Sequence, residues 1–333
     1  MLGTSLHLLG DQSRARHHME RVLEEYVISD RRSCFSRFPY DLIVAACVYL
    51  SRTLWLLGFP DQAVGTAERA IDRALSVNHE TSLCHALARA ACPIARLIGD
   101  LDAAEHYTSM LLDHSRRHGL AWWHTVGRIH QGLLAIMRGD TARGSELLRA
   151  IPNQIGDARY LERWVAFPDT RVEVFAQDGQ TRAAVAGVTA TIKELEQNEE
   201  LWLLPELLRT EGELLLLHDA SREAETAESC FLRALHWARR QGALSLELRA
   251  ATSLARLLLA QARPGEAGAL LRRVYDRFTE GFDTSDLKAA KALLHVIRGE
   301  TEPSDPALSR LHLRPLTAVA LELVGRDHTH RTL

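Results

Sequence analysis

The chain has little lysine, few cysteines and no long apolar run. Only three of its 333 residues are lysine, and its formal net charge is −3. Binding nucleic acid over a broad surface needs clustered positive charge, so this balance disfavours direct nucleic-acid contact. The five cysteines form no C-x-x-C motif, which favours free thiols in a reducing compartment. The longest apolar run, 42–50, is too short to cross a membrane, and no secretory signal precedes it, so we expect a cytoplasmic protein.

Signatures of catalysis and metal binding are also missing. No G-x-x-x-x-G-K-[S/T] motif occurs, so the chain carries no P-loop for ATP. His114 and His118 lie four residues apart and could share a metal ion, but no neighbouring cysteine or carboxylate completes a site. Both fit the cationic last turn of a helix that ends before Gly119. We therefore expect a non-enzyme with no catalytic residue, no cofactor and no metal.

What the sequence does contain is a repeated pattern of a turn residue followed, five positions later, by a small residue. From position 58 to 219 the turn residues are 41, 40, 40 and 40 positions apart, and the last step is 43. Glycine at the turn ends one helix in the left-handed conformation, and Asp11, Asp100 and Asp140 follow it as caps of the next. The pairs are Gly10 with Ala15, Gly58 with Ala63, Gly99 with Ala104, Gly139 with Gly144, Gly179 with Ala184, and, more loosely, Asp219 with Ala224 and Ala262 with Ala267.

A second small residue often stands seven positions before the turn. Two small positions on facing helices allow the helices of a pair to cross closely, which is the signature of the tetratricopeptide (TPR) hairpin. The members of this second set are Ser51, Cys92, Gly132, Gly212 and Ala255.

These spacings predict an all-α fold, a TPR-like α-solenoid of about seven antiparallel helix hairpins with a period of about 40. A capping helix is expected at about 285–297, with Lys288 and Lys291 on its outer side. We expect the repeat domain to occupy 1–298 and a linker with a poorly ordered or short-helical tail to occupy 299–333. Residues 28–40 should form a long connection, and Pro93 and Pro168 should kink their helices or shift their starts. Because Met1 then falls inside the first helix, we expect the chain to be the C-terminal part of a longer protein.

Several stretches resemble one family of bacterial regulators. They are GTSLHLLGDQ (3–12), LWLLGFPDQA (54–63), LCHALARAACP (83–93), LLDHS (111–115), EGELLLL (211–217), ALHWARRQGALSLELRAATSLAR (234–256) and VYDRFTEGFDTSDL (274–287). They are similar to the C-terminal helical-repeat region of large winged-helix transcriptional regulators that carry a signal-transduction ATPase of the AAA/NACHT type. Related tails occur on class III adenylyl cyclases. The resemblance implies a sensor or interaction module, and it supplies no active-site residue because the catalytic domains are absent from this sequence.

The first helix of each TPR hairpin lines a concave groove, so its charged residues are candidates for holding a partner. Charged side chains six or ten positions before a turn could clamp a protein, a peptide or a small effector. They could equally form a solvated face, and the sequence does not decide between these readings. The candidates are Arg52, Arg89, Asp169, Glu173, Arg209, Glu213 and Arg256.

The sequence therefore predicts a non-catalytic interaction or sensor module of an ATP-dependent transcriptional regulator whose DNA-binding and ATPase domains are missing here. One alternative is a free-standing TPR adaptor that scaffolds two proteins. Another is the tail of a signalling protein of the adenylyl-cyclase type. In-frame Walker and winged-helix sequence upstream of Met1 would favour the first reading over the adaptor.

Overall fold

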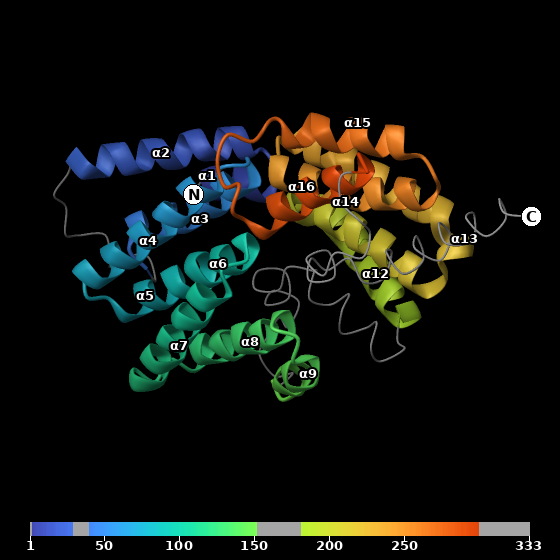
Figure 1. The fold of residues 1–333 in the computed structure, drawn as a ribbon. Helices are drawn as coiled ribbons and strands as arrows, with labels where there is room; N and C mark the ends of the chain where they lie inside the picture. Colours follow the sequence, from blue (N-terminus) through green and yellow to red (C-terminus); the bar gives the residue numbers. More distant parts are fainter. Residues whose placement is uncertain (1, 29–39, 152–180, 300–333) are drawn as a thin grey trace, which may run out of the picture. The chain divides into compact units, whose positions relative to one another are not determined.

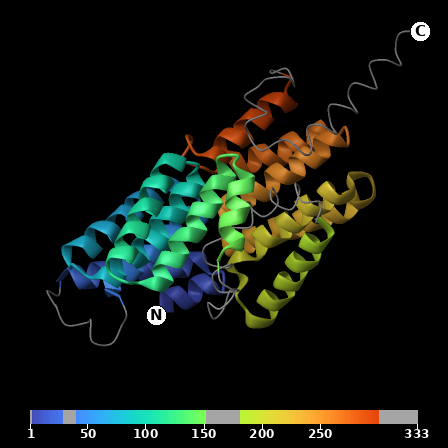
Figure 2. The same ribbon diagram turned by 90° about the horizontal axis from the view of Figure 1, so that it is seen from below.

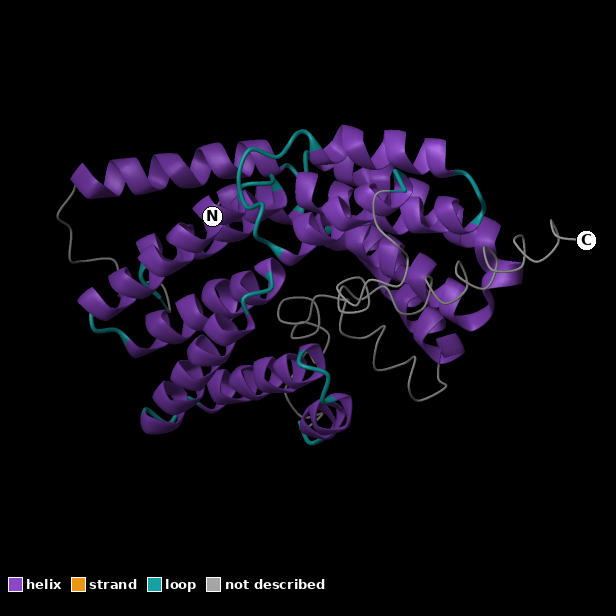
Figure 3. Cartoon of the chain, in the orientation of Figure 1, coloured by secondary structure: helices purple, strands orange, loops and turns teal. Residues whose placement is uncertain are grey.

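The computed structural model describes residues 2–28, 40–151 and 181–299, and every regular element among them is a helix (Figure 3). The all-α prediction is confirmed for these residues. The chain divides into two compact units (Figure 1). Unit 1 comprises Met1–Gln177 with Glu199–Leu203, and unit 2 comprises Asp178–Asn198 with Leu204–Leu333.

Unit 1 consists of helices that pack on their neighbours in chain order, and Figure 2 shows them as a row of adjacent rods. Short turns join the members of each pair, which makes them antiparallel. The elements are α1 (Leu2–Leu8), α2 (Gln12–Ile28), α3 (Leu42–Leu56), α4 (Pro60–Ser76), α5 (Glu80–Ala86), the π-helix η1 (Leu87–Ala91), α6 (Cys92–Ile98), α7 (Leu101–Arg117), α8 (Ala121–Met137), α9 (Thr141–Arg149) and the short 3-10 helix η2 (Leu201–Leu203).

Unit 2 follows the same plan. Its first described helix packs on α13, α13 packs on α14, and α14 contacts both of the helices that follow it. The elements are α12 (Thr181–Asn198), α13 (Leu204–Gln241), α14 (Leu244–Ala260), α15 (Pro264–Tyr275) and α16 (Ser285–Ile297).

The predicted turn residues end helices as expected. Gly10, Gly58, Gly99 and Gly139 all have positive φ, between 85° and 90°, and Ala262 has a φ of 58°. Most residues other than glycine avoid this region because Cβ approaches a carbonyl oxygen there.

The predicted caps are confirmed as well. The side chain of Asp100 accepts a hydrogen bond from the amide of Ala103 at 2.9 Å, and Asp140 accepts from the amide of Arg143 at 3.2 Å. Asp11 accepts in the same way from the amide of Arg14 at 3.2 Å. Each carboxylate satisfies an amide that the first helical turn leaves without a partner.

The small residues lie at buried helix crossings. Ala63 and Ala104, five positions after their turns, are 0% and 1% exposed. A Cβ atom added to Gly144 would lie 2.7 Å from the carbonyl oxygen of Gly132, so these two glycines bring α8 and α9 into backbone contact. A Cβ atom on Gly212 would lie 2.5 Å from Cε1 of Phe231. Side chains larger than these would force the helices apart.

For the repeat at Asp219, the predicted turn is confirmed, whereas the predicted small residue, Ala224, is wrong. Asp219 has non-helical backbone angles, φ −158° and ψ 90°, and it separates two limbs of α13. Its carboxylate caps the second limb by accepting from the amides of Ser221 and Arg222, each at 3.2 Å. Ala224 is only partly buried, whereas Ala227 is fully buried. The fully buried small residue therefore stands eight positions after this turn, three more than predicted.

Pro93 introduces a π-helix and leaves the helical segment 80–98 unbroken. The Cys92 amide donates to the carbonyl of Leu87, five residues back, which is π-type bonding. Proline has no N–H and its ring crowds the preceding turn, and a π-segment relieves that crowding.

The predicted capping helix is confirmed as α16 over the expected residues, with Lys288 and Lys291 exposed. Thr284 takes the N-cap position, but its side chain makes no capping hydrogen bond. Several expectations lie outside the described residues: the connection after Ile28 up to residue 39, the kink at Pro168, the turn at Gly179 and the tail from residue 300 onward.

Candidate functional site

The candidate groove residues fall into two separate sets. Arg52, on α3, and Arg89, on η1, belong to unit 1, where they are 5% and 6% exposed. In unit 2, Arg209 is 8% exposed, whereas Glu213 and Arg256 are partly buried. The solvated-face reading therefore does not hold for the three buried arginines. Asp169 and Glu173 lie outside the described residues.

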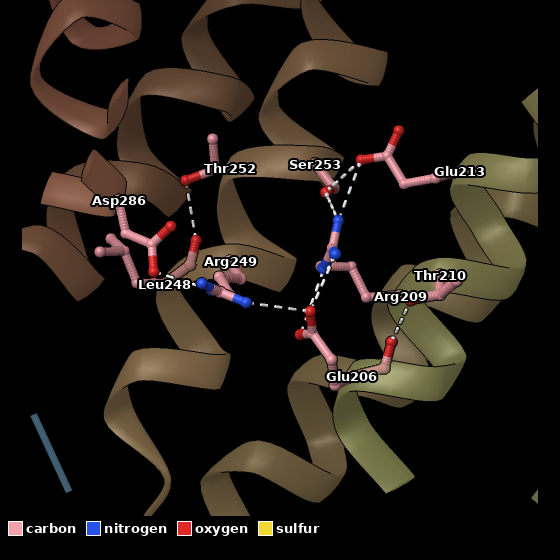
Figure 4. A network of polar contacts seen from close by, with 9 residues as sticks. All are labelled: Glu206, Arg209, Thr210, Glu213, Leu248, Arg249, Thr252, Ser253 and Asp286. Atoms are coloured by element: carbon pink, nitrogen blue, oxygen red, sulfur yellow. Dashed lines mark hydrogen bonds and ion pairs between the residues drawn. The ribbon is translucent and has the colours of Figure 1, made fainter. Parts of the chain in front are cut away.

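In unit 2, Arg209 belongs to an ion network centred on the fully buried carboxylate of Glu206 (Figure 4). Arg209 donates from Nη2 to Glu206 Oε1 at 2.9 Å and from Nε to Oε2 at 3.2 Å. Arg249 of α14 donates from Nη1 to the same Oε1 at 3.2 Å. The forked pairing holds a guanidinium and a carboxylate in one plane, which is the strongest form of such a contact.

The network continues in two directions from this centre. Arg249 Nε donates to Asp286 Oδ2 at 2.7 Å, which ties the capping helix α16 to α14. On the other side, Ser253 donates from Oγ to Glu213 Oε1 at 2.5 Å, and Arg209 Nη1 lies 3.5 Å from the same oxygen. Three carboxylates and two guanidiniums thus form a connected set of ion pairs across α13, α14 and α16. Removing one partner of such a buried pair commonly costs about 3–5 kcal/mol.

Sequence reasoning missed Glu206, Arg249 and Asp286. A signal for two of them was present, because Glu206 stands thirteen positions before the turn at Asp219 and Arg249 stands thirteen before the turn at Ala262. Equal positions in neighbouring hairpins lie side by side, so opposite charges there form a ladder from one hairpin to the next.

A second buried carboxylate links the motifs at 234–256 and 274–287. Glu247, 2% exposed, accepts from Arg239 Nε at 2.7 Å and from Arg277 Nη1 at 2.5 Å. Arg239 lies in the last turn of α13 and Arg277 follows α15. Glu247 of α14 therefore connects the end of α13 to the segment after α15.

Unit 1 carries a different arrangement, which we call the basic cluster. Its members come from three consecutive first helices, and their exposed fractions are between 0% and 6%. The basic cluster comprises Arg52 of α3, His85 of α5, Arg89 of η1, Arg96 of α6 and His130 of α8.

The π-helix determines where His130 of the basic cluster binds. Because Pro93 has no amide N–H, it cannot donate to the carbonyls one turn before it. His130 supplies a donor instead, with Nε2 at 3.0 Å from the carbonyl oxygen of Ala88. A carbonyl oxygen only accepts, so Nε2 carries the proton and the neutral ring has its lone pair at Nδ1. Pro93, the π-helix and His130 are thus linked, because the proline lacks an amide donor in this turn and the histidine supplies one.

Burial, reinforced by the neighbouring arginines, lowers the pKa of both histidines of the basic cluster and keeps them neutral. Burial, together with the charges of Arg89 and Arg52, lowers the pKa of His85 from its ordinary 6.5 to about 3. Burial, then the charge of Arg96, lowers the pKa of His130 well below 6.5. Desolvation disfavours the charged imidazolium, and a nearby guanidinium disfavours it further.

Aromatic rings border the basic cluster. The ring of His85 stacks on Tyr40, with centroids 4.1 Å apart, and the guanidinium of Arg52 lies 4.7 Å from the centroid of Trp202, which belongs to unit 1. A cation over a ring face gains electrostatic attraction beyond simple packing.

His114, in the last turn of α7, and His118, which caps the C-terminus of α7, lie close together. The rings of His114 and His118 have centroids 4.4 Å apart, and His114 Nε2 lies 3.3 Å from the carbonyl oxygen of Glu80. No group of three potential metal ligands occurs among the described residues.

No family model matches this sequence, and a search of curated proteins finds no match. Among the described residues, no helix combines the length and the apolar character that a membrane span needs.

Proposed function

We propose that this chain is a non-catalytic interaction and sensor module, built as a TPR-like α-solenoid of about seven hairpins with a period of about 40. The single observation that carries the proposal is the recurrence of left-handed turn residues, aspartate caps and buried small residues at the ends and crossings of successive helices. The small residue after Asp219 is the exception to this register. Such a frame presents one side chain per hairpin at equal positions along a groove.

The described residues offer the proposal further support. The carboxylates of Glu206, Glu213 and Glu247 are all engaged by arginine or serine, so none is placed to act as a general base. The four cysteines in the described part are buried, and burial raises the pKa of Cys84 and Cys92 to about 12. Thiols of that kind are poor nucleophiles.

We propose further that the module belongs to a cytoplasmic ATP-dependent transcriptional regulator, in which partner binding biases the ATPase. This step rests on the resemblance of the motifs given above. A free-standing adaptor, or the tail of a cyclase-type signalling protein, is the alternative. Sequence encoding a Walker motif and a winged helix in frame upstream would favour the regulator.

Site-specific photo-crosslinking in bacterial cells tests the binding role. A photoreactive amino acid is placed at Arg256 or Glu213, on first helices, and for comparison at Arg222 or Lys193, which are exposed on other helices. We expect one discrete crosslinked partner from the first-helix positions and none from the comparison positions. Crosslinks of equal yield from all four positions, or none from any, would contradict the proposal, as would turnover of ATP by the purified chain.

A further inference from the structure

The segment Glu199–Leu203 belongs to unit 1, although the residues on both sides of it in the chain belong to unit 2. Glu199 follows α12 with a φ of 56°, a left-handed conformation that turns the chain out of the helix. The 3-10 helix η2 comes next and contacts α1. Its Trp202 and Leu203 are 2% and 3% exposed. The segment is therefore held in unit 1 by contacts of its side chains.

The indole ring of Trp202 rests on side chains from two first helices, which we call the indole seat. The ring of His7 stacks on the indole, with centroids 5.3 Å apart, and the guanidinium of Arg52 lies 4.7 Å from the indole centroid. Both contacts attract an aromatic ring beyond simple packing. Trp202 thus occupies the position of Arg52, which the sequence predicts for a partner. The indole seat comprises His7 of α1 with Tyr49 and Arg52 of α3, and the rings of His7 and Tyr49 meet edge to face at 6.1 Å.

The hydrogen bonds of His7 fix which of its nitrogens carries the proton. Nδ1 of His7 lies 2.9 Å from Gln12 Oε1, while Nε2 of the same amide donates to the His7 carbonyl oxygen at 3.1 Å. The amide oxygen of Gln12 only accepts, so Nδ1 carries the proton and Nε2 has the lone pair. Burial, followed by the charge of Arg52, lowers the pKa of His7 from 6.5 to about 3, so the ring is neutral at pH 7.

The indole seat contains an acceptor that its present occupant does not satisfy. Nε2 of His7 is buried and has no hydrogen-bond partner, although Trp202 stacks on the same ring. A buried acceptor left in this way raises the free energy of the folded chain. A ligand that brings an aromatic ring together with an N–H or O–H donor satisfies the whole seat. The indole of tryptophan and the phenol of tyrosine both have such a donor, and phenylalanine has none.

We propose that the indole seat is a docking site for a tryptophan or tyrosine of a partner peptide, and that Trp202 occupies it in the free chain as an autoinhibitory contact. The assignment rests on the proposed interaction function and names one site and its partner chemistry. A tethered occupant competes at an effective concentration on the order of millimolar, so a partner displaces it only by binding more tightly. The hydrogen bond to Nε2 of His7 provides that advantage.

Binding of a free peptide to a chain whose seat has been emptied tests the proposal. The probe is fluorescein-labelled NEELWLL, the sequence of residues 198–204, and the readout is fluorescence anisotropy with the full chain. We expect Trp202→Ala to bind it at least about tenfold more tightly than the unmodified chain, because the tethered indole no longer competes. Trp237→Ala is the matched control, since this indole lies 5.0 Å from the guanidinium of Arg240 on α13 and its removal leaves the seat occupied.

Nitrogen resonances of the histidine ring show whether the donor reaches its acceptor. In Trp202→Ala, we expect the Nε2 resonance of His7 to move upfield on addition of NEELWLL, since its lone pair then accepts a hydrogen bond. The peptide NEELFLL should bind more weakly and leave this resonance in place. Trp202→Leu, which keeps an apolar side chain without an indole, should bind NEELWLL with intermediate affinity, and it replaces Trp202→Ala should circular dichroism show that the alanine variant is unfolded.

Equal binding of NEELWLL to the unmodified chain and to both Trp202 variants would overturn the proposal, as would no binding to either variant. Equal binding of NEELALL, or an unmoved Nε2 resonance in the peptide complex, would overturn it as well. N-acetyltryptophanamide that bound as tightly as the peptide would assign a small indole ligand in place of a peptide partner. A chain that fails these tests but yields a discrete crosslink from Arg256 or Glu213 would retain the interaction role and lose only this site.

Discussion

At the scale of single residues, close approach between helices depends on the absence of side-chain atoms. Gly144 shows this most directly, because an added Cβ would meet the backbone carbonyl of Gly132 at 2.7 Å. Gly187 on α12 offers a contrast, since an added Cβ there meets nothing within 4 Å. The same substitution should therefore have opposite effects at these two helical positions.

We predict that Gly144→Ala lowers the free energy of unfolding by about 1–3 kcal/mol, the usual cost of overpacking. Gly187→Ala should raise it by about 0.5–1 kcal/mol, because alanine loses less backbone entropy in a helix. Urea unfolding followed by circular dichroism measures both. If Gly144→Ala left the free energy of unfolding unchanged, α8 and α9 would not be held in backbone contact at this crossing.

His85 makes stability depend on pH. Its pKa is about 3 in the folded chain and near 6.5 in the unfolded chain, so between these values the unfolded chain binds the extra proton. The stability from neutral His85 is fully present above about pH 6.5 and is lost progressively as the pH falls toward 3. The slope from one such group is at most about 1.4 kcal/mol per pH unit.

We predict that His85→Phe, which keeps a ring beside Tyr40 and cannot titrate, flattens the stability curve between pH 6 and 4. Denaturant midpoints measured every half unit provide the test. Parallel curves for the variant and the unmodified chain would show that His85 is not held neutral in the folded state. His236→Phe is the comparison, because the ring of His236 makes a local T-shaped contact with Trp237 on the same helix and lies outside the basic cluster.

At the scale of elements, most features that depend on local chemistry could be predicted from the sequence. The glycine turns, the aspartate caps and α16 follow from residues within one turn of each boundary. The π-helix and the buried location of Ala227 in place of Ala224 could not be predicted in this way. They depend on how a helix accommodates a proline and on where its partner helix crosses, and both are tertiary effects.

The candidate site was predictable only in part. Arg52, Arg89 and Arg209 were identified by their register before a turn, and the structure buries all three. The network around Arg209 was not predicted. The pairing of Arg209 with Glu206 and of Arg249 with Asp286 depends on how the helices pack, which the sequence does not state directly. The histidines of the basic cluster gave no signal of their own, since histidine in a helix is common and its neighbours decide its role.

The proline, the π-helix and His130 form one coupled element, and this coupling can be measured. We predict that His130→Leu lowers the free energy of unfolding by about 1–3 kcal/mol, because the carbonyl of Ala88 loses its donor. In a Pro93→Ala background, the restored amide N–H can satisfy the carbonyls of this turn. His130→Leu should then lower the free energy of unfolding by a smaller amount than it does in the unmodified chain.

A double-mutant cycle in urea gives the coupling between the two positions. Equal losses from His130→Leu with and without Pro93→Ala would show that the histidine stabilises α8 by packing alone. Leu133, 2% exposed on the same helix, supplies the control. Leu133→Ala should lower the free energy of unfolding equally with and without Pro93→Ala, because the packing of Leu133 does not depend on an amide N–H at position 93.

At the scale of the whole molecule, the two units carry different kinds of interior charge, and the repeat frame that we propose would accommodate both. The network of unit 2 pairs arginines with carboxylates and ties its helices together, whereas the basic cluster of unit 1 brings buried arginines and neutral histidines onto neighbouring helices. A repeat frame permits this division because each hairpin contacts only its neighbours. We propose that the period of about forty residues sets the positions of most of these side chains, and this period is the part of the proposal to test first.

The most direct test of that claim is an experimental structure of the chain around Gly179, which lies outside the described residues. The repeat predicts an α-helix that ends at Gly179 with positive φ and packs antiparallel on α12 against Ala184, which is 4% exposed. A strand before Gly179, or a helix that continues through it without a turn, would contradict the repeat.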